Sequence, residues 1–309
     1  MDQKQSTSYP LQFAILIGLM GIFLVISAFV VAVMGSIMLH VPFQQTMKAM
    51  NAPENADTAR LLNTIASLLV FVCPAIIYAR LVSRRPLQQL GFNTRFTIKQ
   101  FLIVIAITFA AMVLGGALGD LNEKIPLPAG WYNKAKELEE AYKAATLAMA
   151  RMHTPADYII ALAVLAAFPA LCEELIFRGA LQQIMVGWTR SKWLGIIITS
   201  ILFSAFHFSY FGFLPRAVLG LVLGLVFYNS RNIWLSIFLH FLNNAFVVTQ
   251  LYVDGIKGKA IDKTMDESMP MWWGVIAIVL LVIFLRTFNR ETGKLFRADT
   301  VHSSPETNV

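Results

Sequence analysis

The stretch YIIALAVLAAFPALCEELIFR, residues 158–178, joins a long apolar run to three charged side chains, Glu173, Glu174 and Arg178. An apolar run of this length is typical of a helix that spans a lipid bilayer. An ionised side chain in hydrocarbon costs several kcal/mol unless it is paired or faces water. The stretch therefore predicts a membrane helix whose charged residues lie inside the protein, in a site that offsets this cost.

The composition of the whole chain agrees with a membrane protein. Of its 309 residues, 57% are hydrophobic and 14% are charged, whereas soluble domains carry about 25% charged residues. The net charge of +7 comes from Lys and Arg between apolar runs and near the C-terminus, where they set topology, so we expect no nucleic-acid partner. Cys73 and Cys172 both lie in apolar runs, which favours buried thiols over a disulfide or a cysteine metal site.

The apolar runs predict an all-α, polytopic bundle of about eight transmembrane helices, because backbone groups in lipid must be satisfied within a helix. We expect a polar segment at 1–10, a transmembrane domain at 11–288 and a basic, polar and disordered tail at 289–309. Segment 131–153 is charged and amphipathic, which indicates a helix at the membrane surface or a solvated helical loop. The expected spans are 11–39, 61–81, 100–119, 157–182, 193–212, 215–229, 232–251 and 271–288.

The basic loops predict the orientation. The connection RLVSRRPLQQLGFNTRFTIK, residues 80–99, holds five Lys or Arg and no acid, and a second basic cluster lies at 286–297. Lys and Arg are enriched in cytoplasmic loops. We therefore expect both termini in the cytoplasm, in an integral protein of the plasma (inner) membrane if the host is bacterial.

The charged residues of the fourth span differ in their local partners. Glu174 and Arg178 are four residues apart with the acid first, the favoured order for a helical ion pair. Glu173 is rotated by about 100° from Glu174, so it lacks this partner and is a candidate general base. Pro169 cannot donate a backbone hydrogen bond and is expected to kink the helix near these residues.

Two other apolar runs carry polar residues. LFSAFHFSYF (202–211) holds His207, and SIFLHFLNNAFVV (236–248) holds His240, Asn243 and Asn244. His240 and Asn244 lie four residues apart on one helix face and could form an oxyanion hole, while His207 could meet Glu173 across a water. This set describes acyl-group hydrolysis without a Ser or Cys nucleophile. Buried core histidines, an interhelical hydrogen bond from Asn243 and packing by Phe203 are the simpler interpretations.

Three motifs, EELIFR (173–178), FSAFH (203–207) and HFLNN (240–244), follow one another on separate apolar runs. Their types and order resemble the CAAX-protease and bacteriocin-processing family of intramembrane endopeptidases, which is related to the type II CAAX prenyl endopeptidases. The resemblance covers about residues 157–250, the expected protease core. It implies hydrolysis of a peptide bond in a membrane-associated protein or peptide, with the lipid bilayer as the other partner.

Carried over by motif, the resemblance implies that Glu173 and His207 activate water. It also implies that His240 and Asn244 bind the oxyanion and that Glu174 and Arg178 support the site. We expect no cofactor, but one Glu and two His could also ligate zinc. Two other classes use the same residues differently. A proton-coupled transporter would use them as a relay, but no repeated topology is visible. A non-catalytic scaffold would use them only to join helices.

Overall fold

A computed structural model describes residues 7–258 and 270–302. All regular secondary structure in these ranges is helical apart from one isolated bridge residue, which confirms the all-α prediction. Within these ranges, seven helices are long and apolar enough to cross a membrane. Large apolar side chains such as Val25 and Phe29 are 71% and 65% exposed, which suits contact with lipid rather than water. The protein is thus an integral membrane helical bundle.

Each expected span corresponds to a helix or to a series of helical segments. Two spans are composite, because α-helical segments continue through π-helical turns. Single helices are α1 (Tyr9–Leu39), α6 (Ile98–Glu123), α11 (Lys192–Ala205), α12 (Phe213–Ser230), α13 (Ile233–Ile256) and α15 (Met271–His302). The composite spans are α3 (Ala56–Ser67), η3 (Leu68–Val72) and α4 (Cys73–Val82), and then α8 (Pro155–Ala161), η4 (Leu162–Ala167), α9 (Phe168–Ile176), η5 (Phe177–Gln182) and α10 (Gln183–Thr189). The connecting helices are η1 (Phe43–Gln45), α2 (Thr46–Met50), η2 (Pro53–Asn55), α5 (Pro86–Gln89) and α7 (Ala129–Met149).

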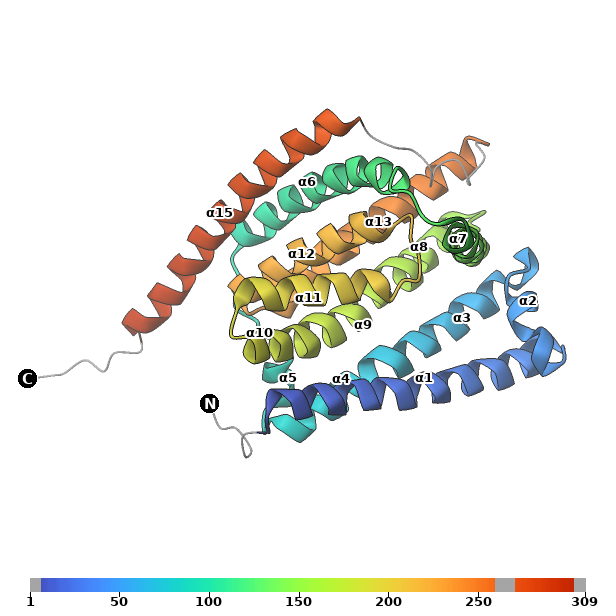
Figure 1. Ribbon diagram of the computed structural model, residues 1–309, viewed down its shortest axis with the longest axis horizontal. Coiled ribbons are helices and arrows are strands. Elements are labelled where there is room, and N and C mark those ends of the chain that lie inside the picture. Colours follow the sequence, from blue (N-terminus) through green and yellow to red (C-terminus); the bar gives the residue numbers. More distant parts are fainter. Residues whose placement is uncertain (1–6, 259–269, 303–309) are drawn as a thin grey trace, which may run out of the picture.

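Figure 1 shows the long helices running roughly along one direction. Helix α1 packs on α3 and α4 at one side of the bundle, and α15 packs along α6 at the other side. The composite helix α8–α10 lies between them and contacts α11 and α13. The start of α1 and the end of α15 lie at the same end of the bundle, as the expected topology requires.

The structure corrects two expected boundaries. The fifth span was expected at 193–212, but α11 has 14 residues and ends at Ala205, which is shorter than the ~20 residues of a full span. His207 therefore lies in the turn after α11 and not within an apolar helix. At the other boundary, α15 continues past 288 to His302. Its basic and acidic residues beyond the apolar part are good helix formers.

Both composite spans place a π-helical segment just before a proline. Pro74 follows η3, and Pro169 follows η4. A proline ring clashes with the carbonyl four residues earlier, and a widened turn is one way for the helix to continue past it. The carbonyl that Pro169 cannot use belongs to Leu165, inside η4. Pro169 is therefore accommodated by the π-helical turns of η4, which lead directly into the helix that carries Glu173.

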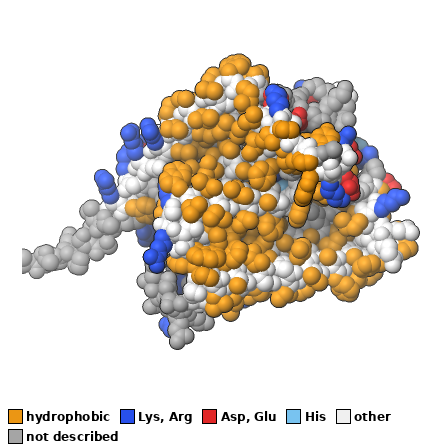
Figure 2. Space-filling model, in the orientation of Figure 1, with side chains coloured by type: hydrophobic (Ala, Val, Ile, Leu, Met, Phe, Trp, Pro, Cys, Tyr) orange, Lys and Arg blue, Asp and Glu red, His pale blue; other side chains and the backbone are white. Residues whose placement is uncertain are grey.

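The two ends of the bundle differ in charge. At one end, segments 80–99, 189–193 and 228–234 hold eight Lys or Arg and no acid, and we call this the basic end. The opposite end carries α7, whose Lys and Glu side chains are mixed. Figure 2 shows the hydrophobic surface between these ends, with Lys and Arg prominent at the left. Under the positive-inside rule, the basic end is predicted to face the cytoplasm.

Candidate active site

Glu173, His207 and His240 meet where α9, the turn after α11 and α13 come together. The Glu173 Oε2 atom lies 3.9 Å from His207 Nε2 and 3.8 Å from His240 Nε2. These distances are too long for direct hydrogen bonds, but they suit a water molecule held between the Glu173 carboxylate and an imidazole Nε2. The Glu173 and His207 side chains are 16% and 22% exposed, but the Glu173 Oε2 atom that faces both histidines is buried and has no hydrogen-bond partner among the described residues.

The predicted ion pair is present. Arg178 Nη1 donates to Glu174 Oε1 at 2.8 Å, and both side chains are fully buried. Arg178 Nη2 also donates to the Gly220 carbonyl at 3.2 Å, and its guanidinium lies 4.5 Å from the centre of the Phe203 ring. A buried charge that loses one of its partners is strongly destabilising. The pair and the carbonyl therefore offset part of the cost of burying these charges, while Glu174 Oε2 and Arg178 Nε are buried without a hydrogen-bond partner among the described residues.

Each histidine is held through Nδ1 and directs Nε2 toward Glu173. His240 Nδ1 lies 3.0 Å from Glu174 Oε1, and His207 Nδ1 lies 2.9 Å from the Phe203 carbonyl oxygen. A carbonyl or an ionised carboxylate only accepts hydrogen bonds. Each Nδ1 therefore carries a proton, and in the neutral ring Nε2 is left as the acceptor that faces the site.

Glycines on α12 let this charged helix approach closely. Glu174, Arg178 and Gln182 lie on one face, and Gln182 Nε2 donates to the Gly224 carbonyl at 3.0 Å, as Arg178 does to Gly220 one turn earlier. A Cβ atom at Gly224 would lie 2.8 Å from Gln182 Oε1 and 2.7 Å from an Ile196 methyl carbon. The Gly220-x-x-x-Gly224 spacing thus provides the close helix contact that it predicts.

The two asparagines of α13 contact each other. Asn243 Nδ2 donates to Asn244 Oδ1 at 3.2 Å. Because this bond uses the carbonyl oxygen of Asn244, it orients the amide so that Nδ2 remains a donor. The sequence suggested that Asn243 hydrogen-bonds to another helix, but its side chain donates to the next residue of the same helix. Asn244 lies one turn after His240 on α13, as the oxyanion-hole hypothesis requires.

Two contributors were missed in the sequence. Phe203 was assigned only to packing, but its ring packs edge to face against both imidazoles, with ring centres 5.0 Å from His207 and 5.7 Å from His240. Arg216 lies in the first turn of α12, where its Nη1 is buried without a hydrogen-bond partner among the described residues. An arginine inside the apolar run 215–229 is the signal that could have identified it.

Helix α7 contacts the turn that carries His207. Ser209 Oγ donates to Glu139 Oε2 at 2.5 Å, and the Arg216 guanidinium lies 4.9 Å from the centre of the Tyr142 ring. The rings of Tyr132 and Phe211 meet edge to face at 6.1 Å. The amphipathic segment expected at the membrane surface therefore packs against the turn between α11 and α12 and the start of α12.

As the structure places them, the Glu173 oxygen and the two histidine nitrogens are too far apart to coordinate one zinc ion. Zinc ligands at 2.0–2.2 Å around one tetrahedral ion are about 3.4 Å apart, whereas the carboxylate–imidazole separations are 3.8 and 3.9 Å. Within residues 7–258 and 270–302, no group of three or more His, Cys, Asp or Glu side chains is placed to hold a metal ion.

Independence from metal remains a prediction, and metal analysis of the active purified protein tests it. We expect no stoichiometric zinc and no loss of turnover with a chelator, because Glu173 and the two histidines are assigned to water and substrate. Stoichiometric zinc, with activity lost on chelation and regained on zinc addition, would instead make Glu173, His207 and His240 the ligands.

Comparison with known proteins supports the motif resemblance. Residues 155–246 match the family model described as type II CAAX prenyl endopeptidase Rce1-like. No curated protein and no solved structure matches the chain. The matched segment contains all six residues of the expected site, and the family indicates a protease embedded in a membrane. The match confirms the resemblance: residues 155–246 are similar to the type II CAAX prenyl endopeptidase family.

Proposed function

We propose that this protein hydrolyses a peptide bond of a membrane-associated protein or peptide, with Glu173 as the general base. One observation carries the proposal. The Glu173 carboxylate is faced by the Nε2 atoms of two histidines at nearly equal distance, and both rings are fixed from behind through Nδ1. Such fixed groups around a water-sized space suit water activation, because catalysis depends on pre-positioned groups.

In the first step, a water held between Glu173 and His207 attacks the carbonyl carbon of the substrate. The water oxygen forms the new bond, and its proton passes to the Glu173 carboxylate or to His207 Nε2. Both are proton acceptors in the state described above. The carbonyl oxygen becomes an oxyanion, which donors aimed at its final position stabilise.

We assign the oxyanion contacts to Asn244 Nδ2 and His240 Nε2. Because Glu174 holds the Nδ1 proton of His240, His240 can donate from Nε2 only as a doubly protonated imidazolium. We therefore propose that His240 is already doubly protonated when the water attacks, so the one proton removed from water goes only to Glu173 or His207. In the second step the oxyanion re-forms the carbonyl double bond and the carbon–nitrogen bond breaks, and the leaving amine takes the proton that the base removed from water.

A comparison of peptide ends in host membranes tests this function and identifies the substrate. Membranes containing wild-type protein should show cleaved peptide ends that are absent when the gene is deleted. Asn244→Ala should lower their rate of formation by about 10²–10³-fold with little effect on folding, because it removes one oxyanion donor. Asn243→Ala is the matched variant, and its effect should be smaller because Asn243 only orients Asn244. Equal effects of the two substitutions would contradict the assignment to Asn244.

A further inference from the structure

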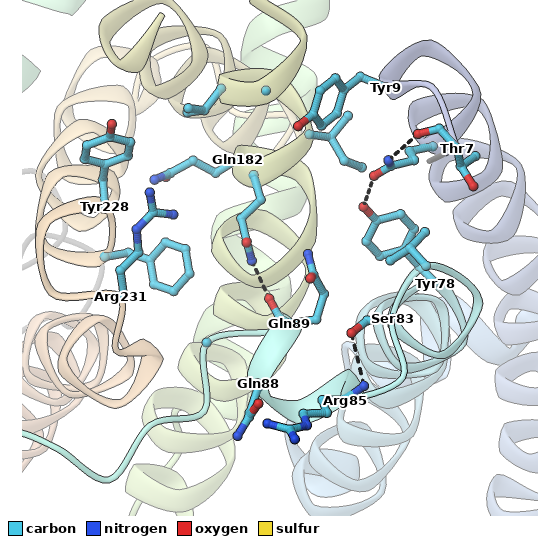
Figure 3. Close-up of a pocket in the computed structure, with 18 residues that line it drawn as sticks. Thr7, Tyr9, Tyr78, Ser83, Arg85, Gln88, Gln89, Gln182, Tyr228 and Arg231 are labelled. Carbon is cyan, nitrogen blue, oxygen red and sulfur yellow. Dashed lines mark hydrogen bonds between the residues drawn. The ribbon is translucent and has the colours of Figure 1, made fainter. Parts of the chain in front are cut away.

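A large polar cavity lies at the basic end of the bundle. Its volume is about 930 Å³, and its walls come from the start of α1, the end of α4, α5, α10 and the end of α12. Figure 3 shows its lining side chains pointing into one space from these separate helices. The catalytic proposal uses none of the residues that line it.

The lining of the cavity is polar and carries only positive charge. It contains five glutamines and three tyrosines, and its ionised side chains are Arg85 and Arg231. None of its 18 residues is Asp or Glu. Both arginines are exposed, and among the described residues neither forms an ion pair with an acid. Arg231 lies over the Tyr228 ring at 4.9 Å, and Lys192 lies over the same ring at 4.9 Å.

Hydrogen bonds hold the walls of the cavity in place. Tyr78 donates to Gln12 Oε1 at 2.7 Å, and Gln12 Nε2 donates to the Thr7 carbonyl at 2.7 Å, which ties α4 to the start of α1. Gln183 Nε2 donates to the Gln89 carbonyl at 2.6 Å, which ties α10 to α5. A preformed polar cavity loses less conformational freedom when it binds a ligand.

The cavity lies at the level where lipid headgroups are expected. Tyr9, Trp188 and Trp193 at this end are 41%, 45% and 56% exposed, and Tyr and Trp gather at the membrane–water interface. Basic pockets between membrane helices suit anionic lipid headgroups, and arginine matches the geometry of phosphate oxygens. We propose that this cavity binds a phosphate-bearing group, supplied by the headgroup of an anionic phospholipid or by a soluble phosphate ester.

Two double variants of equal charge test the proposal. Arg85→Gln with Arg231→Gln removes both arginines of the cavity. Arg84→Gln with Arg190→Gln is the control, because Arg84 is the exposed neighbour of Arg85 and does not line the cavity. Arg190 is matched to Arg231, since both are exposed and cap the end of a helix in the left-handed backbone conformation, each with a φ of 53°.

Binding to the purified full chain in detergent is measured with two probes. Short-chain phosphatidylglycerol represents the lipid source, and glycerol 3-phosphate represents the soluble source. We expect the cavity variant to bind its probe at least about tenfold more weakly, because charge-assisted hydrogen bonds are lost. The control variant should bind like wild type, and the probe that binds more tightly identifies the source. Both variants should unfold at the wild-type temperature, because all four side chains are exposed.

Three results would overturn the proposal. Failure of the wild-type protein to bind either probe would show that the cavity only holds solvent. Equal weakening in the two double variants would show a diffuse effect of surface charge. Unchanged binding in the cavity variant would place the phosphate elsewhere. If the cavity variant fails to fold, the single substitutions Arg85→Gln and Arg231→Gln answer the same question against Arg84→Gln and Arg190→Gln.

Discussion

Glu173→Gln is expected to lower the rate of peptide cleavage by about 10²–10⁴-fold, the usual contribution of general acid–base catalysis. The glutamine keeps the size of the side chain but cannot take a proton from water. Folding should be unchanged, because Glu173 has no direct ion-pair contact shorter than 3.8 Å. The measurement is the cleavage rate of the substrate found in host membranes, with thermal unfolding in detergent as the check on folding.

Cys172→Ala is the matched control for this substitution. Cys172 precedes Glu173 in α9, and its free thiol is an alternative candidate for a catalytic group, as a nucleophile. It is fully buried, so the alanine variant should cleave at a rate close to that of wild type. Loss of cleavage in Cys172→Ala together with near-normal cleavage in Glu173→Gln would remove Glu173 from the mechanism.

Arg178→Ala is expected to lower the free energy of unfolding by about 3–5 kcal/mol, because it leaves Glu174 buried without its main counter-charge. Activity should fall as well, since Glu174 also holds His240. Chemical unfolding in detergent measures the loss. An unchanged unfolding free energy would mean that the pair is exposed or absent in the membrane protein.

A double variant separates the uncompensated charge from the loss of packing. Glu174→Gln with Arg178→Met removes both charges and keeps most of the volume beside Phe203. Replacing a buried ion pair by groups of similar volume is often close to neutral in stability, so this variant should be more stable than Arg178→Ala. Its activity should remain low, because the carboxylate that orients His240 is gone. Stability as low as that of Arg178→Ala would assign the effect to packing instead.

Local spacing was enough to predict the fold class and part of the site. Apolar runs identified the spans, because hydropathy is the property that a bilayer selects. The four-residue spacing of Glu174 and Arg178 identified their ion pair, because one helix determines that geometry. In both cases the relevant contacts lie within one segment or between a segment and lipid.

The contacts between segments could not be predicted in the same way. Hydropathy does not mark the end of α11, since the apolar residues continue through Phe206 and Phe208, and His207 was therefore assigned to a helix. No spacing on α13 indicates that His240 meets Glu174 as well as Glu173. Glu139 holds the turn of His207 through a hydrogen bond from Ser209, and these two residues are 70 positions apart in the sequence. Such contacts follow from packing rather than from a local pattern.

We propose that this chain alone hydrolyses a peptide bond and needs Glu173 to do so. The most direct test is mass spectrometry of a substrate peptide incubated with purified protein in lipid vesicles. We expect two product peptides whose masses together equal the substrate plus one water, formed by wild type and nearly absent with Glu173→Gln. A substrate that stays intact with folded wild-type protein, or products that form equally well with Glu173→Gln, would contradict it.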